Sequence, residues 1–89
     1  MMEAWIFHGT GSVFSSGVFI TKEAAETYIK KYKLTGVLTL YPVNEGIYDW
    51  AIANKIFTPK KESERTSEFI QRFTTASQEH YHYEDGERG

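Results

Sequence analysis

The sequence predicts an α+β fold: a single, mostly antiparallel β-sheet of about four strands with helices packed on one face, in the order β-β-α-β-α-α-β. Three observations support this fold class. Residues 22–33 place apolar side chains at helical spacing. Residues 79–84 alternate strictly between two kinds of side chain, which is typical of a strand. Strand-like segments also stand at both ends of the chain and between the helical segments, which favours one antiparallel sheet.

The first two strands are expected within residues 3–8 and 17–20. Both segments are rich in strand-forming residues, such as Trp5-Ile6-Phe7 in the first. The connection of about eight residues is long for a tight hairpin, so it can carry a bulge or a functional tip. It begins with the glycine-rich segment Gly9–Ser12, but a phosphate-binding loop needs a helix N-terminus directly after it. Because a strand follows instead, we interpret this segment as a flexible turn.

The first helix is expected over about Lys22–Lys33. Thr21 can cap its N-terminus, since the hydroxyl can accept a hydrogen bond from a free backbone N–H group. Glu23 falls in the first turn, and Lys30 falls late in the helix. Both charges match the helix dipole.

The second half of the chain predicts a strand, two helices and a final strand. Residues 37–41 form the strand, which Pro42 closes because proline cannot donate to a ladder. A short helix is expected within residues 44–53. A third begins at Thr66 or Ser67, and its inward-facing residues are expected to be Phe69, Ile70, Phe73 and Ala76.

The 89 residues are enough for one domain, which we place at residues 1–86, with residues 87–89 as a polar tail that frays. Aromatic residues make up 16% of the chain, so a few large rings can supply much of its core. There are no cysteines, which excludes disulfides and thiolate zinc sites and suits the cytoplasm.

The charge balance argues against two classes of partner. Lys and Arg number 10 against 12 Asp and Glu, so no basic excess attracts nucleic acid or an anionic membrane. No apolar run reaches the length of about 18 residues that a membrane span needs. The first seven residues contain Glu3 and lack a basic region, so we do not expect them to form a signal peptide.

The expected final strand contains the most suggestive group of side chains. His80, His82 and Glu84 are two residues apart, so they share one face, while Tyr81 and Tyr83 point to the other. We expect the two tyrosines to pack beneath the helices, with an aromatic binding surface as the alternative.

Two imidazoles on one face could hold a divalent metal. The third ligand would be Glu84, Glu79 or His8. The alternative is a solvated strand face whose histidines pair with neighbouring carboxylates. No other cofactor is expected.

Two further groups are candidates for a site. Trp50 is expected to fill the core and Asp49 to face solvent. The alternatives are that Asp49 is a buried acid or that the two residues belong to a binding surface.

A serine hydrolase is not indicated, because no Gly-x-Ser-x-Gly elbow is present and nothing orients a base. The serines considered for that role are Ser15, Ser16 and Ser77.

The chain also resembles a family of small uncharacterised bacterial domains. The resemblance covers about Glu3 to Gly86, and its last block is the most specific. It is carried by Trp5-Ile6-Phe7-His8-Gly9, Ser16-Gly17-Val18-Phe19, Leu34-Thr35-Gly36-Val37-Leu38-Thr39, Tyr41-Pro42-Val43, Tyr48-Asp49-Trp50-Ala51-Ile52, Phe69-Ile70-Gln71-Arg72-Phe73 and Ser77-Gln78-Glu79-His80-Tyr81-His82-Tyr83. The resemblance implies a bacterial, cytoplasmic, stand-alone protein, and no known activity or catalytic residue.

Two functions are therefore open. The favoured one is a non-catalytic interaction module that binds a protein partner or associates with itself, as in a homodimer, since small sheets leave edges that pair readily. The other is a metal- or small-ligand-binding domain that uses His8, His80 and His82, with or without enzymatic activity. The first predicts a molecular size that depends on concentration, and the second a melting temperature that depends on metal.

Overall fold

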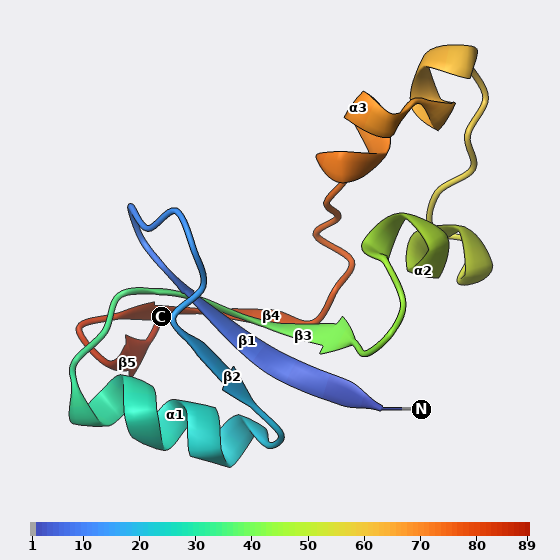
Figure 1. Cartoon of the computed structure of the whole chain (residues 1–89). Coiled ribbons are helices and arrows are strands. Elements are labelled where there is room, and N and C mark those ends of the chain that lie inside the picture. Colours follow the sequence, from blue (N-terminus) through green and yellow to red (C-terminus); the bar gives the residue numbers. More distant parts are fainter. Residues whose placement is uncertain (1) are drawn as a thin grey trace. The chain divides into compact units, whose positions relative to one another are not determined.

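The computed structural model describes residues 2–89 and contains one open antiparallel sheet (Figure 1). Its five strands lie in the order β2-β1-β3-β4-β5, so the α+β class is confirmed with one strand more than expected. The strands are β1 (Glu3–Gly9), β2 (Gly17–Phe19), β3 (Gly36–Pro42), β4 (His80–Glu84) and β5 (Glu87–Arg88).

Three α-helices and one 3-10 helix complete the fold: α1 (Lys22–Lys31), α2 (Ile47–Ala53), η1 (Glu62–Arg65) and α3 (Ser67–Gln71). Thr21 caps α1 as expected, and its hydroxyl accepts from the backbone N–H of Ala24 at 3.1 Å. The second helix lies within the expected residues 44–53, but its N-cap is Gly46 and not Asn44, the residue expected to cap it. Asn44 has a positive φ of 65° and Gly46 is extended, so neither can lie inside a helix.

The chain divides into two compact units, which we call the sheet unit and the helical unit. The sheet unit contains the residues up to Val43 together with Gln78–Gly89, and the helical unit is Asn44–Ser77. The sheet therefore carries α1, whereas α2, η1 and α3 build a unit of their own. The single domain over residues 1–86 stays a prediction. Within residues 2–89, no helix is long and apolar enough to cross a membrane.

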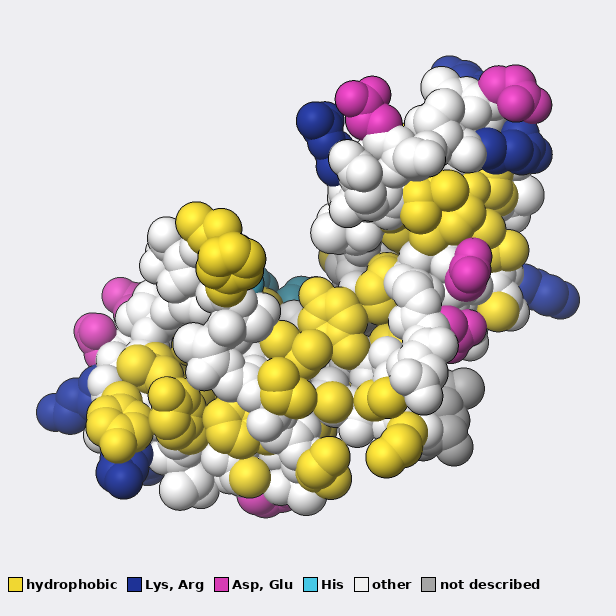
Figure 2. Space-filling view, in the orientation of Figure 1, with side chains coloured by type: hydrophobic (Ala, Val, Ile, Leu, Met, Phe, Trp, Pro, Cys, Tyr) yellow, Lys and Arg dark blue, Asp and Glu magenta, His cyan; other side chains and the backbone are white. Residues whose placement is uncertain are grey.

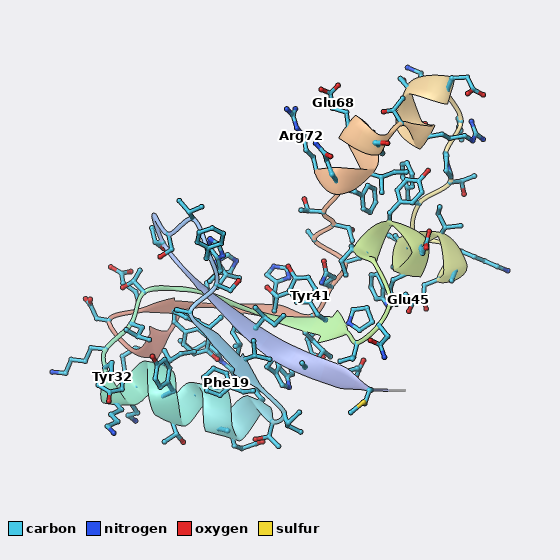
Figure 3. The ribbon with its side chains drawn as sticks, viewed as in Figure 1. Phe19, Tyr32, Tyr41, Glu45, Glu68 and Arg72 are labelled. Carbon is cyan, nitrogen blue, oxygen red and sulfur yellow. The ribbon has the colours of Figure 1, made fainter. Side chains whose placement is uncertain are left out.

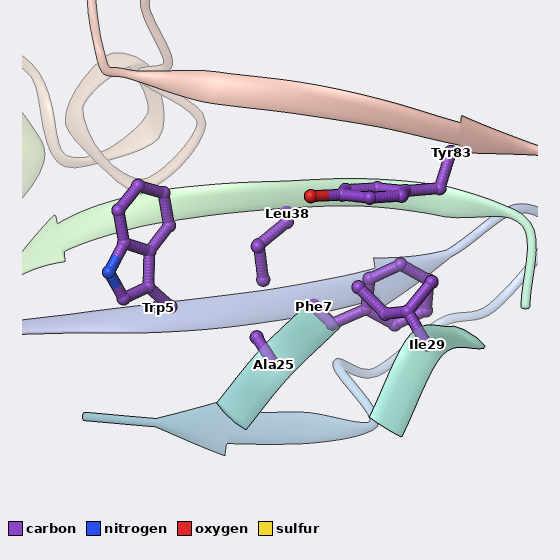
Figure 4. Packing of buried hydrophobic residues seen from close by; sticks show 6 residues of the cluster. All are labelled: Trp5, Phe7, Ala25, Ile29, Leu38 and Tyr83. Carbon is purple, nitrogen blue, oxygen red and sulfur yellow. The ribbon is translucent and has the colours of Figure 1, made fainter. Parts of the chain in front are cut away.

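The core of the sheet unit lies between α1 and one face of the sheet (Figure 4). Alternation along β1 turns Trp5 and Phe7 to this face, and one helical turn brings Ala25 and Ile29 onto it from α1. Phe7, Ile29 and Leu38 are almost completely buried. Burying a side chain of this size stabilises the fold by about 1.5–3 kcal/mol. The core cluster consists of Trp5, Phe7, Ala25, Ile29, Leu38 and Tyr83.

Gly36 allows β1 and β3 to approach closely. A Cβ atom at this position would lie 2.3 Å from the carbonyl oxygen of His8 and 2.8 Å from the Cα of Gly9. Both neighbours are backbone atoms of a paired strand, so neither can move aside without breaking the register. Only glycine fits here.

The C-terminal end differs from the expected frayed tail. A two-residue turn at Asp85 and Gly86, with φ angles of 50° and 85°, leads into β5, and Arg88 pairs with Tyr83 across the ladder. The Gly86 N–H donates to the carbonyl of Leu34 at 2.9 Å. These bonds hold the last residues against the sheet.

Four aromatic rings form the centre of the helical unit. Phe57 and Phe73 are the closest pair, with ring centroids 4.9 Å apart. The Tyr48 hydroxyl donates to the carbonyl of Glu64 at 2.8 Å and so ties α2 to η1. The cluster consists of Tyr48, Phe57, Phe69 and Phe73, which confirms the inward direction expected for Phe69 and Phe73. Ile70, expected to face inward, is 39% exposed instead.

Candidate functional site

The strand with the two histidines has the expected geometry. It is extended from His80 to Glu84, and Tyr83 is buried on the face that α1 covers. The rings of His80 and His82 lie on the opposite face, with centroids 5.4 Å apart and planes at 80°. His80 is held locally, since its Nδ1 lies 2.7 Å from the carbonyl oxygen of Gln78 and donates to it.

His8 lies on the same face, one strand further away. The register pairs His8 with Val37 and Val37 with His82, so β3 separates the two histidines. Two strand spacings put their backbones roughly 10 Å apart. The sheet thus brings all three imidazoles to one face, but it does not bring His8 next to His82.

The ring of His8 is engaged by the loop between β1 and β2. Nε2 lies 2.8 Å from the carbonyl oxygen of Ser12, which can only accept, so Nε2 carries the proton. Nδ1 lies 3.3 Å from the hydroxyl of Ser15 and accepts from it in the neutral ring. Both nitrogens therefore hold the loop, and neither is free to bind a metal.

The described residues 2–89 contain no group of three or more His, Asp or Glu side chains that could hold a metal ion. The carboxylate of Glu79 accepts a hydrogen bond from the Tyr81 hydroxyl at 2.5 Å. Glu84 is exposed at the end of β4. The pair His80 and His82 is thus without the third ligand that the sequence-based hypothesis requires.

Tyr83 has a structural role. It is only 5% exposed, and its hydroxyl donates to the carboxylate of Glu26 on α1 at 2.5 Å. Burial, followed by this hydrogen bond to Glu26, raises the pKa of Tyr83 well above its usual range. The core interpretation of this tyrosine agrees with its position.

Tyr81 lies at the edge of the same face and contacts two cations. The Nζ of Lys22 is 4.1 Å from its ring centroid, and the guanidinium carbon of Arg88 is 4.5 Å from it. The hydrogen bond to Glu79 raises the pKa of its hydroxyl. Tyr81 therefore joins α1, β4 and β5.

The remaining predicted candidates lie in the helical unit. Asp49 is exposed in the first turn of α2, as expected. Trp50 is half-buried, and none of the aromatic ring pairs within the described residues includes it, so its role in the core stays a prediction. A hollow of about 340 Å³ lies elsewhere in this unit, near Glu68 and Arg72 (Figure 3). Its lining residues are Ser63, Thr66, Glu68, Phe69 and Arg72, none of which the sequence singled out.

The largest unexplained feature is a group of exposed apolar side chains around β2. Val13 and Phe14 are each 83% exposed at the tip of the loop between β1 and β2, where Figure 2 shows hydrophobic side chains standing clear of the surface. Val18 in β2 is 67% exposed and Ile20, just after it, is 74% exposed. We call these four residues the neutral edge surface.

This surface lies in a stretch without charge. No Asp, Glu, Lys or Arg occurs from Gly9 to Thr21, although 25% of the whole chain is charged. The sequence predicts Val18 and Ile20 only as residues of the second strand. The uncharged run was the signal that could have identified the surface.

β2 is also an open edge of the sheet, since it pairs with β1 alone. The opposite edge, β5, consists of Glu87 and Arg88 and follows Glu84 and Asp85. Charged side chains discourage pairing with another strand. The two edges therefore differ: β5 is protected by charge and β2 is not.

Neither a characterised protein nor a solved structure matches the chain. Residues 4–89 match a family described as "Domain of unknown function (DUF7710)", which confirms the resemblance inferred from the sequence blocks. The match spans nearly the whole chain, and this protein therefore belongs to that family of domains of unknown function.

Proposed function

We propose that this protein is a non-catalytic protein-interaction module that binds through the neutral edge surface. The observation that carries the proposal is the exposure of Val13, Phe14, Val18 and Ile20, between 67% and 83% each, on one uncharged segment at a sheet edge. Strongly exposed apolar side chains gathered on one short segment of a small protein indicate an interaction site. Covering each side chain is worth up to about 1.5–3 kcal/mol, so a partner gains substantially from doing so.

The loop that carries Val13 and Phe14 is anchored, which supports a binding role. His8 holds it through Ser12 and Ser15, and the Ser16 N–H donates to the carbonyl of Phe7 at 2.9 Å. A loop held in one conformation loses less entropy when a partner binds. The apolar tip is thus presented in a prepared position.

The polar candidates support binding rather than chemistry. His8 is used to hold the loop, and the hydroxyls of Tyr81 and Tyr83 donate to carboxylates within the sheet unit. A metal- or small-ligand-binding role would rest on His80 and His82 alone, and no specific observation favours it. We further propose a cytoplasmic location, where a chain without cysteine folds with no need of an oxidising environment.

Site-specific photo-crosslinking tests this function directly. A photoreactive residue in place of Val13 is compared with one in place of Ile56, which is apolar, 40% exposed and in the helical unit. The crosslinking is carried out in the cells that produce the protein. At position 13 we expect covalent adducts of defined mass with a partner protein, and these adducts should disappear in the Val18→Lys variant. The same adducts should not form at position 56. The same adducts at both positions, or none at position 13, would contradict the proposal.

A further inference from the structure

We infer that the neutral edge surface binds a second copy of this chain, with the two β2 strands pairing antiparallel so that two sheets join edge to edge. The inference rests on the proposed function and names its partner. It is argued from the chemistry of the two sheet edges, the symmetry of the contact and the charge of the surface.

The two edges restrict which strands can meet. Gly17–Phe19 contains neither a charge nor a proline, which are the residues that normally prevent an edge from pairing. β5 offers Glu87 and Arg88 instead. A contact of β2 with β5 would desolvate these charges against an apolar strand. It would also be a head-to-tail contact, which can add further copies without forming a closed assembly. A contact of β2 with β2 is two-fold and closes at two copies.

The two-fold contact has a defined centre. Val18 is the middle residue of β2, so an antiparallel pairing centred on the strand places Val18 opposite Val18 of the second copy. Val18 pairs with Ile6 and therefore faces away from α1. A β-branched apolar pair across the new ladder stabilises it.

The α1 side of the same edge is already occupied by the chain itself. Phe19 lies next to α1, with its ring centroid 5.5 Å from that of Tyr28 (Figure 3). Its ring also covers Gly17, where a Cβ atom would lie only 2.6 Å from the Phe19 Cε2. Phe19 is therefore held on the core side, and Val18 is the side chain of β2 left for a partner.

Charge complementarity favours a second copy over a charged partner. The segment from Gly9 to Thr21 offers no ionic group to pair with, so a charged partner would bury its charges without compensation. A second copy brings an equally uncharged segment. Within this segment, no like charges then face each other across the two-fold axis, where each residue approaches its own counterpart.

The area of the surface sets the expected strength. At about 25 cal/mol per Å², a transfer energy of about 1.5–3 kcal/mol corresponds to roughly 60–120 Å² of apolar surface per side chain. The four side chains therefore expose on the order of 300 Å² of apolar surface per copy. A standard interface buries about 800 Å² per partner. The dimer is therefore weak and reversible, and we expect it to form with a Kd in the micromolar range or above.

A charge-swap experiment on the purified full chain tests this arrangement. Sedimentation velocity is recorded from about 10 μM to 1 mM, the range in which weak interfaces associate, for the wild type, Val18→Lys, Val18→Glu and an equimolar mixture of the two variants. We expect the mean mass of the wild type to rise toward that of two chains. Each variant alone should stay monomeric, because like charges would face each other, and the mixture should associate again. Ile56→Lys is the matched control and should associate like the wild type.

Three results would overturn the inference. A wild type that stays monomeric over the whole range would exclude a second copy, while adducts at position 13 would still support the interaction module. Association of Val18→Lys to the same extent as the wild type would place the contact elsewhere. If both variants are monomeric and their mixture stays so, Val18 does not face its counterpart. Circular dichroism of each variant establishes that a loss of mass is not a loss of fold.

Discussion

The hydroxyl of Tyr83 on β4 donates a hydrogen bond to the carboxylate of Glu26 on α1, with 2.5 Å between the two oxygens. The two residues lie far apart in the sequence, so this bond fastens the C-terminal strand to the first helix. Arg88 reaches the same carboxylate at 3.5 Å and brings β5 into the contact. One carboxylate thus joins three elements of the sheet unit.

Tyr83→Phe tests the contribution of this bond to stability. The variant keeps the buried ring and removes only the donor. A hydrogen bond to a charged group contributes about 1.5–3 kcal/mol, and we expect the lower end because water can still reach Glu26, whose side chain is 36% exposed. Urea unfolding followed by circular dichroism measures the loss. A free energy of unfolding equal to that of the wild type would show that the bond contributes nothing.

The raised pKa of Tyr83 predicts a loss of stability in alkali. Folding favours the neutral phenol, so the stabilisation is fully present below the ordinary value of 10.0 and decreases as the pH rises above it. The free energy of unfolding should therefore fall as the pH rises from about 10 to about 11, the first pH unit above that value. Tyr83→Phe should fall less steeply, although Tyr81 leaves part of the dependence in place. Parallel slopes for the two proteins would contradict this role of Tyr83.

In the helical unit, Glu64 supports the segment that precedes η1. Its Oε1 accepts from the backbone N–H groups of Lys60 at 2.8 Å and Lys61 at 3.1 Å. The hydrogen bond from Lys60, then that from Lys61, lowers the pKa of this carboxyl below the ordinary value of 4.5. The ionised form is the one that the fold favours.

Glu64→Gln should therefore increase the hydrogen-exchange rates of the Lys60 and Lys61 amides at neutral pH. In the wild type, the extra protection should be present above pH 4.5 and be lost as the pH falls through the lowered pKa. Exchange followed by NMR, corrected for the intrinsic pH dependence of exchange, measures both effects. Glu62→Gln is the control, because the Glu62 side chain is 97% exposed and should leave both amides unchanged.

His8→Ala should release the loop between β1 and β2 without unfolding the sheet. The ring is exposed and only its bonds to Ser12 and Ser15 are lost. We expect backbone order parameters from ¹⁵N relaxation to fall for residues 10–16 and to stay unchanged in β3. Unchanged order parameters in the loop would mean that His8 does not hold it.

The elements that the sequence predicted well are those with a strong local cause. α1 begins where the Thr21 cap and the Glu23 charge place it. β4 has the expected alternation, which buries Tyr83 and exposes His82. In both cases the pattern within one segment decides the structure, so no knowledge of the neighbours is needed.

The features that the sequence did not predict depend on distant contacts. β5 has only two residues, and it forms because a tight turn, the Leu34 carbonyl and the Tyr81 ring hold it in place. The position of His8 relative to His82 depends on the strand order, in which β3 lies between them. Spacing along the chain contains no information about either.

The neutral edge surface was missed for a different reason. Val18 and Ile20 have the composition of core residues, and a sequence does not distinguish an apolar side chain that faces the core from one that awaits a partner. Their exposure became visible only with the edge position of β2. Such residues are where a sequence-based assignment of the core fails and where function is to be sought.

Amide hydrogen exchange of Gly17–Phe19, measured at increasing protein concentration, tests the role of the β2 edge most directly. The N–H groups of β2 that point away from β1 have no partner strand within the sheet unit. If two copies pair through this edge, these amides become protected as the concentration rises, while those of β5 at the other edge keep constant rates. Exchange rates in β2 that stay the same across the concentration series would contradict the account.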